Sequence, residues 1–259
     1  MTIYAHRAGT GKPLLLVHGL GGSWKSWRTI LDALAAEREV IAIDLPGHGA
    51  TPAEADSGSF AGLARSLDTF LVEEGLTGVD MVGSSLGGRL VLEMARRGRA
   101  SAVVSLDPGG FWQGWERDYV RTTLGGSVAM LRMLRSVLPF LARNAASRSA
   151  LLAQLSARPW ALDGNLIATE LASLADTRTV GPLIVDLAEG PKQEGPAAPG
   201  TGAIAIGWGR SDRLLFANQA ERAVAAFPSA KLHWFADSGH FPMWDQPRET
   251  IDLILATIT

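Results

Sequence analysis

A serine between two glycines is the first feature with a clear chemical use. Residues 83–87 read Gly-Ser-Ser-Leu-Gly, a G-x-S-x-G pattern that follows the apolar run Val79–Val82 and precedes a stretch of helical period. A sharp strand-to-helix turn would expose the Ser85 hydroxyl, and a β-carbon at position 83 or 87 would crowd the backbone. The pattern predicts Ser85 as a nucleophile. The alternative is a glycine-rich turn that carries an incidental serine, and Ser84 would point elsewhere on the same turn.

A serine hydroxyl needs a base that titrates near neutral pH, and histidine is the usual choice. The chain has five histidines. His240 follows the last predicted strand, where parallel sheets place functional residues, and it comes last in the order Ser, Asp, His that this motif predicts. We expect His240 to be the base. The other four are interpreted as loop, turn or strand residues: His6, His18, His48 and His233.

A carboxylate near a strand end should orient the imidazole and stabilise its charged form. Asp212 lies just past the predicted strand Ala203–Trp208 and 28 residues before His240, so it is the first candidate. Asp107, at the end of the preceding strand, is the alternative. Asp237 is too near His240 in sequence to face it easily, and Asp245 is interpreted as a cap of the final helix, Pro247–Thr259.

A second glycine-rich turn can supply backbone donors for an oxyanion. Residues 18–22 read His-Gly-Leu-Gly-Gly after the first apolar strand. Glycines let backbone N–H groups approach a developing negative charge closely. We expect two oxyanion donors, the amide of Leu86 directly after the nucleophile and the amide of Leu20 in this turn.

Short apolar strands alternate with amphipathic segments along most of the chain. This pattern is typical of a doubly wound, mostly parallel sheet that is covered on both faces. Thr2–Arg7, followed by a glycine-rich turn, is expected to form an antiparallel edge hairpin. The predicted strands are Leu14–His18, Val40–Asp44, Val79–Gly83, Ala102–Asp107, Ala203–Trp208 and Lys231–Phe235.

The alternation stops between Asp107 and Ala203, where the period is helical apart from a weak strand signal at Leu183–Val185. Seven arginines lie between residues 110 and 160, and six acidic residues between 163 and 194. These charges are interpreted as solvated helix faces. We expect residues 110–195 to be a helical cap inserted into a core of residues 1–109 and 196–259.

Composition excludes several classes of protein. The chain has 259 residues, 47% of them hydrophobic, with a net charge of −2, which fits a globular domain and gives no sign of nucleic-acid binding. There is no cysteine, so thiol nucleophiles, disulfides and thiolate metal sites are excluded. No apolar run reaches the ~20 residues of a membrane span, and the N-terminus does not resemble a signal peptide. A cytoplasmic location is the expectation.

The order His18-Gly19, Gly83-x-Ser85-x-Gly87, Asp212 and His240 resembles the α/β-hydrolase family over essentially the whole chain. The resemblance implies an eight-stranded, mostly parallel sheet with a helical cap after the sixth strand, and an acyl-enzyme formed on serine. It implies neither a metal nor an organic cofactor. Members with an aspartate nucleophile, such as epoxide hydrolases and haloalkane dehalogenases, differ from this chain at Ser85, and the dehalogenases also place Trp where Leu86 stands.

These residues favour hydrolysis of a carboxylic ester or lactone of a small to medium apolar compound. Cleavage of a carbon–carbon bond in a β-diketone-like substrate and cofactor-free perhydrolysis remain alternatives, as does a slow ligand-binding receptor that keeps the fold. Four residues are candidates for an apolar substrate pocket: Trp24, Phe111, Trp112 and Met243. The arginines of the cap would suit a substrate carboxylate instead. A small molecule is the only partner expected.

Overall fold

The computed structural model describes residues 3–258 and contains one sheet of seven strands in the order β1-β3-β2-β4-β5-β6-β7. All neighbouring strands are parallel except β1, which runs antiparallel to β3. The strands are β1 (Ala5–Ala8), β2 (Pro13–Val17), β3 (Glu39–Ile43), β4 (Val79–Ser84), β5 (Ala100–Leu106), β6 (Ile204–Gly209) and β7 (Ala230–Phe235). The mostly parallel sheet and its six central and C-terminal strands are as predicted.

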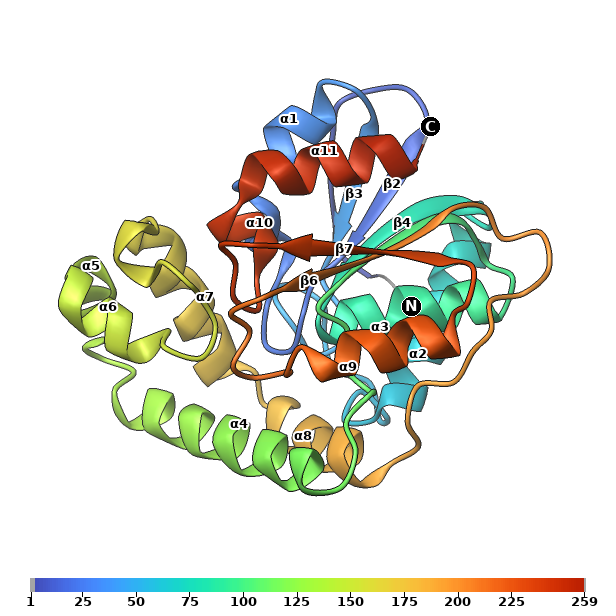
Figure 1. Cartoon of the computed structure of the whole chain (residues 1–259). Coiled ribbons are helices and arrows are strands. Elements are labelled where there is room, and N and C mark those ends of the chain that lie inside the picture. The colour runs from blue at the N-terminus through green and yellow to red at the C-terminus, as the bar shows by residue number, and fades with distance from the viewer. Residues whose placement is uncertain (1–2, 259) are drawn as a thin grey trace.

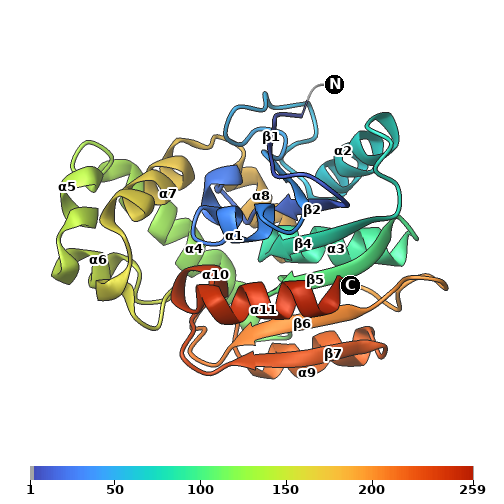
Figure 2. The same ribbon diagram turned by 90° about the horizontal axis from the view of Figure 1, so that it is seen from above.

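Helices cover both faces of the sheet (Figures 1 and 2). Short helical segments η1 (Trp24–Trp27) and α1 (Leu31–Ala35) lie with α10 (Pro242–Asp245) and α11 (Pro247–Thr257) on one face. The other face carries α2 (Phe60–Glu73), α3 (Leu86–Arg96) and α9 (Asn218–Ala226). Side chains along a strand alternate between these layers: Leu14 and Leu16 of β2 pack in one core cluster, Leu15 and Val17 in the other.

Two expectations about the sheet edge are wrong. Residues 3–258 contain seven strands rather than eight, because only one strand precedes β2. That strand, β1, does not form a hairpin with β2. Both edges of β2 are already occupied by β3 and β4, so β1 crosses to the free edge of β3. Gly9 allows the crossing with φ of 77°, in a place where a β-carbon would lie 2.2 Å from the carbonyl oxygen of Ala35.

A group of helices fills the chain between β5 and β6, and in both views its α5, α6 and α7 extend to the left of the sheet (Figures 1 and 2). We call it the α4–α8 segment. The weak strand signal at Leu183–Val185 is wrong, since these residues lie inside α8, where Leu183 and Ile184 are buried and Val185 is exposed. The segment comprises α4 (Trp115–Met133), α5 (Leu138–Arg143), α6 (Ala145–Leu151), η2 (Pro159–Ala161), α7 (Gly164–Asp176) and α8 (Val180–Glu189).

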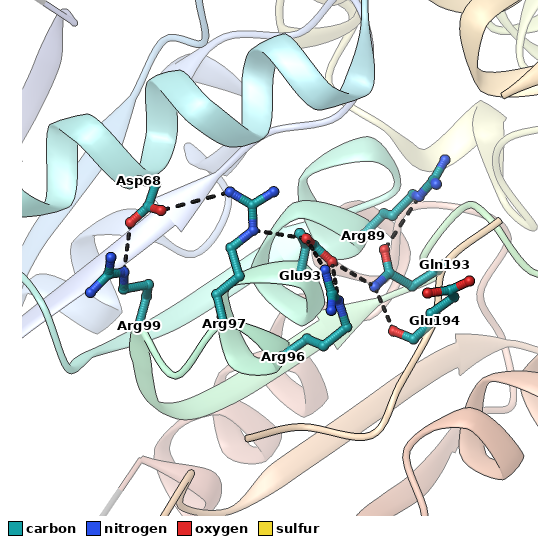
Figure 3. Close-up of polar contacts among 8 residues, drawn as sticks. All are labelled: Asp68, Arg89, Glu93, Arg96, Arg97, Arg99, Gln193 and Glu194. Atoms are coloured by element: carbon teal, nitrogen blue, oxygen red, sulfur yellow. Dashed lines mark hydrogen bonds and ion pairs between the residues drawn. The ribbon is translucent and has the colours of Figure 1, made fainter. Parts of the chain in front are cut away.

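The chain that returns from α8 to β6 is fastened to α3 by a polar network (Figure 3). Glu93 of α3 accepts hydrogen bonds from Arg96, Arg97 and Gln193, the last of which belongs to the returning chain. Burial alone would raise the pKa of Glu93, but these hydrogen bonds outweigh it and lower the pKa to about 2. Arg89 adds a hydrogen bond to the carbonyl of Pro191. The α4–α8 segment is therefore anchored to the helix that begins directly after Ser85.

Candidate active site

Ser85 occupies a strained turn between β4 and α3. Its φ of 55° and ψ of −113° lie outside the regions that most side chains adopt. A β-carbon at Gly83 would lie 2.2 Å from the carbonyl oxygen of Gly87, and one at Gly87 would lie 2.0 Å from that of Val17. Only glycine fits at these two positions. The motif therefore has the strand–turn–helix setting that its sequence predicts.

Three residues from distant parts of the chain meet at this turn. His240 Nε2 lies 2.9 Å from Ser85 Oγ, and His240 Nδ1 lies 2.7 Å from Asp212 Oδ2. The imidazole and the carboxylate are buried, with 1% and 6% of their residues' surfaces exposed. The other oxygen of Asp212 accepts hydrogen bonds from the amides of Leu214 and Leu215, at 2.8 and 2.9 Å. With Asp212 as acceptor, Nδ1 carries the proton and Nε2 is free to accept one from Ser85.

Asp107, the alternative acid, lies beside this group in a different state. It is fully buried, and its Oδ1 accepts a hydrogen bond from the amide of Gly209 at 2.9 Å. Burial, and next the negative charge of Asp212, raise the pKa of Asp107 well above its usual value. The neutral form of its carboxyl group is therefore favoured more than in an ordinary aspartate, and the structure pairs the imidazole with Asp212 instead.

Asp107, Asp212 and His240 also lie close enough to be considered as metal ligands, with one atom of each within 4.8 Å of the others. The geometry favours hydrogen bonding over metal binding. The 2.7 Å separation of His240 Nδ1 and Asp212 Oδ2 is that of a direct hydrogen bond. Two ligands of one ion would each need ~2.0–2.2 Å to the metal, so tetrahedral ligands would lie farther apart.

The glycine-rich turn 19–22 lies against Ser85. A β-carbon at Gly19 would lie 3.2 Å from Ser85 Cβ, so Leu20 is the next residue after one that packs on the serine. Leu86 is the first residue of α3, where backbone amides have no acceptor within the helix. The use of the Leu20 and Leu86 amides as oxyanion donors stays a prediction.

Two histidines near this turn are structural. His18 Nε2 accepts from the amide of Leu45 at 3.0 Å, and its Nδ1 lies 2.7 Å from the carbonyl oxygen of Gly19, so the ring is neutral with the proton on Nδ1. Burial lowers the pKa of His18 to about 4 and that of His48 to about 3. Neither ring contacts Ser85, which agrees with the loop and turn interpretations.

A small apolar cavity of about 40 Å³ lies between the turn 19–22 and the α4–α8 segment. Phe241 and Trp244 contribute to its wall from the loop after His240. The aliphatic side of the wall comes from the α4–α8 segment: Leu152, Leu155, Ile167, Leu171 and Leu174. One carboxyl group, that of Glu170 in α7, also lines it.

The structure places the four predicted pocket residues elsewhere. Trp24 is half-buried and stacks on the ring of His6 at 3.9 Å. Phe111 and Trp112 are buried in one core cluster and Met243 in the other. None of the four lines the cavity between the turn 19–22 and the α4–α8 segment. A tryptophan near a motif in the sequence does not show which way the chain turns its side chain.

The seven arginines between residues 110 and 160 have partners within the protein. Arg121 pairs with Glu189 and Arg135 with Asp176. Arg148 is buried and donates hydrogen bonds to four backbone carbonyl groups. None of these seven arginines lines the cavity between the turn 19–22 and the α4–α8 segment, so a carboxylate bound there would not meet them.

Two buried acidic residues were missed as site residues. Asp245 accepts hydrogen bonds from the Ser156 hydroxyl, the amide of Ala157 and the amide of Gly239, so it joins the α4–α8 segment to the loop that carries His240. Glu170 faces the cavity. Its position three residues after Ile167 and four before Leu174 places it on the apolar face of α7, and this spacing could have distinguished it from the solvated acids nearby.

The model of the α/β hydrolase family matches residues 14–253, and the chain belongs to this family. A relative in Cupriavidus necator, the dihydrolipoyllysine-residue acetyltransferase component of the acetoin cleaving system, is 28% identical over 249 residues, 95% of this chain and 63% of that protein. The chain thus spans less than two thirds of that relative. The 2-hydroxy-6-oxo-2,4-heptadienoate hydrolase of Pseudomonas putida is 37% identical over 103 residues, covering 36% of this chain and 35% of that enzyme.

Solved structures support the fold. An esterase from Exiguobacterium antarcticum superposes with a TM-score of 0.78 at 18% identity, covering 99% of this chain and 95% of that one. Within residues 3–258, no helix has both the length and the apolar character that crossing a membrane requires.

Proposed function

We propose that this chain is a serine hydrolase that cleaves a carboxylic ester or lactone of a small to medium apolar compound. The observation that carries the proposal is the continuous relay Ser85 Oγ–His240 Nε2 and His240 Nδ1–Asp212 Oδ2, with separations of 2.9 and 2.7 Å. Distances of this size allow proton transfer without rearrangement. The α4–α8 segment, within residues 110–195, acts as the cap in this proposal, and the apolar cavity under it receives part of the substrate.

In the proposed mechanism Ser85 Oγ attacks the carbonyl carbon while His240 Nε2 accepts the serine proton. Asp212 stabilises the imidazolium that forms. The amides of Leu20 and Leu86 donate hydrogen bonds to the tetrahedral oxyanion, and one such donor is typically worth ~2.7–4 kcal/mol. His240 then gives its proton to the leaving alcohol, which leaves an acyl group on Ser85. Water, deprotonated by His240, releases the acid.

Substitution of the two adjacent serines tests this assignment. Ser85→Ala is expected to abolish hydrolysis of 4-nitrophenyl esters of graded chain length and of simple lactones. Ser84→Ala is the matched control: Ser84 is buried, and its hydroxyl has no hydrogen-bond partner in the structure, so the variant should keep its activity. A fluorophosphonate should label Ser85, as mass spectrometry of the peptide containing residues 83–87 would show. Equal rates for Ser85→Ala and the wild type would reject the proposal.

The same experiment separates the other functions that the sequence leaves open. Hydrolysis of a panel of β-diketones tests carbon–carbon cleavage. A preference for β-diketones over esters would change the proposed substrate class but keep Ser85 as the nucleophile. A receptor would release no more than one equivalent of product per chain, whereas we expect many turnovers.

A further inference from the structure

The carboxyl group of Glu170 lines the cavity, and no part of the proposed mechanism uses it. Glu170 belongs to α7 and is 7% exposed. Its Oε2 accepts a hydrogen bond of 2.5 Å from the Ser26 hydroxyl, whereas its Oε1 is buried and has no partner in the structure. A buried polar atom without a partner is unfavourable unless something fills the site. Oε1 is therefore a vacant hydrogen-bonding position in an apolar wall.

The cavity that holds Glu170 lies next to the reacting groups. Gly19 lines it and packs against Ser85, since a β-carbon at Gly19 would lie 3.2 Å from Ser85 Cβ. Phe241 lines it too, and its ring meets the ring of His240 edge-on with centroids 4.8 Å apart. A molecule bound here is one residue away from both the nucleophile and the base.

The protonation of Glu170 is balanced near neutral pH. Burial is the main cause and raises the pKa of Glu170 to about 7. The negative charge of Asp44 also raises this pKa, whereas the hydrogen bond from Ser26 and the positive charges of Arg28 and Lys25 lower it. Oε1 is thus a donor in one form and an acceptor in the other. A hydroxyl group, which both donates and accepts, satisfies Oε1 in either form. An ammonium group needs the ionised acid, and a ketone or ether oxygen needs the protonated one.

We propose that Glu170 selects substrates carrying a hydroxyl group on the short chain that enters this cavity. This inference rests on the proposed function and defines its substrate class more closely. The cavity of about 40 Å³ exceeds the ~10–15 Å³ that a single water needs, so it has room for a short chain. Apart from Ser26 and the glycines of the turn 19–22, the remaining wall is aliphatic or aromatic, which suits a carbon chain with one polar substituent.

Pairs of esters that exchange hydroxyl for methyl test the inference. Methyl 3-hydroxybutyrate is compared with methyl 3-methylbutyrate, and 2-hydroxypropyl butyrate with 2-methylpropyl butyrate, so that the hydroxyl is tested on the acyl and on the alcohol side. We expect the wild type to prefer the hydroxylated ester of at least one pair by tenfold or more in kcat/KM. Glu170→Met, which removes both oxygens, should abolish this preference, and Glu170→Gln, which keeps polar atoms there, should retain part of it.

Asp176→Asn is the matched control, since Asp176 lies on the same helix but pairs with Arg135 at the surface. It should leave the preference unchanged. A wild type that does not distinguish either pair overturns the inference, whether or not the variants fold. A Glu170→Met enzyme that keeps the hydroxyl preference and loses only thermal stability also overturns the inference, because Glu170 would then serve only to hold Ser26 in place.

The pH dependence distinguishes the related ligand chemistries. A hydroxyl preference should persist on both sides of pH 7. Two outcomes without a hydroxyl preference would contradict the inference. One is a preference for a 3-aminobutyrate ester that grows above pH 7, and the other is a preference for a 3-oxo ester that grows below pH 7. If Ser85→Ala is inactive but Glu170 variants show wild-type preference, the inference fails and the proposed function stands.

Discussion

Asp212→Asn is expected to lower kcat by about four orders of magnitude, with little change in KM. The reason lies in the partners of this side chain. Two backbone amides, those of Leu214 and Leu215, hold one oxygen of Asp212. In the asparagine variant these donors retain the amide oxygen, so the NH2 group is the one that faces His240 Nδ1. It donates to Nδ1, the ring proton moves to Nε2, and Nε2 can no longer accept the proton of Ser85. Four decades correspond to about 5.5 kcal/mol of activation free energy.

Asp107→Asn is the matched control because it makes the same change in a neighbouring buried carboxyl group. The asparagine oxygen can still accept from Gly209, and the uncharged side chain resembles the neutral acid that burial favours. Its φ of 43° is one that asparagine tolerates. We expect kcat within about tenfold of the wild type. Steady-state kinetics on one ester, with acyl-enzyme formation followed by stopped flow, measure both variants. Equal losses in the two variants, or a larger loss in Asp107→Asn, would refute the reasoning.

Three further predictions concern stability, each measured by urea unfolding. Gly87→Ala should destabilise the fold by about 1–3 kcal/mol, because its β-carbon would lie 2.0 Å from a carbonyl oxygen. Gly125→Ala, whose β-carbon would have no atom within 4 Å, should be neutral or stabilising. Equal effects of the two substitutions would contradict this prediction. Burial lowers the pKa of His18 to about 4 and of His48 to about 3, below the ordinary 6.5. As the pH falls, the two histidines bind protons in the unfolded chain before they do so in the folded protein. The free energy of unfolding should therefore fall by a few kcal/mol between pH 6.5 and 4, and His48→Asn should make this dependence on pH less steep. Burial raises the pKa of Asp107 in the folded protein, so the wild type should lose stability as the pH rises above the ordinary aspartate pKa of about 4. The stability of Asp107→Asn relative to the wild type should therefore increase over that rise, and a difference independent of pH would contradict the raised pKa.

Much of the fold and the candidate triad could be predicted from local patterns. The strand–turn–helix around Ser85 is encoded within residues 83–87, and the apolar strands β2 to β7 begin and end within about two residues of their predicted limits. The order Ser, Asp, His nominated three residues that the structure brings together. Their catalytic role stays a prediction, as does the role of Leu20 and Leu86.

Features that depend on pairing between distant segments could not be predicted. The strand preference of residues near Ala5 does not say which edge the strand joins, and β1 reaches β3 because β2 has no free edge. The cavity forms between the turn 19–22 and α7, about 150 residues later in the chain. The helical period identifies the apolar face of α7 but not the turn against which it packs, so the sequence does not separate Glu170 from the solvated acids nearby. Likewise, the sequence around Trp24 does not show that its ring stacks on His6.

The attachment of the α4–α8 segment to the loop of His240 limits how the molecule can open. Leu155 accepts a hydrogen bond from the amide of His240, and Asp245 grips both Ser156 and Gly239. A displacement of residues 155–157 would therefore pull on the loop that carries His240 and shift the imidazole relative to Ser85. Any motion of the α4–α8 segment that preserves the contact between His240 and Ser85 must leave these three residues in place.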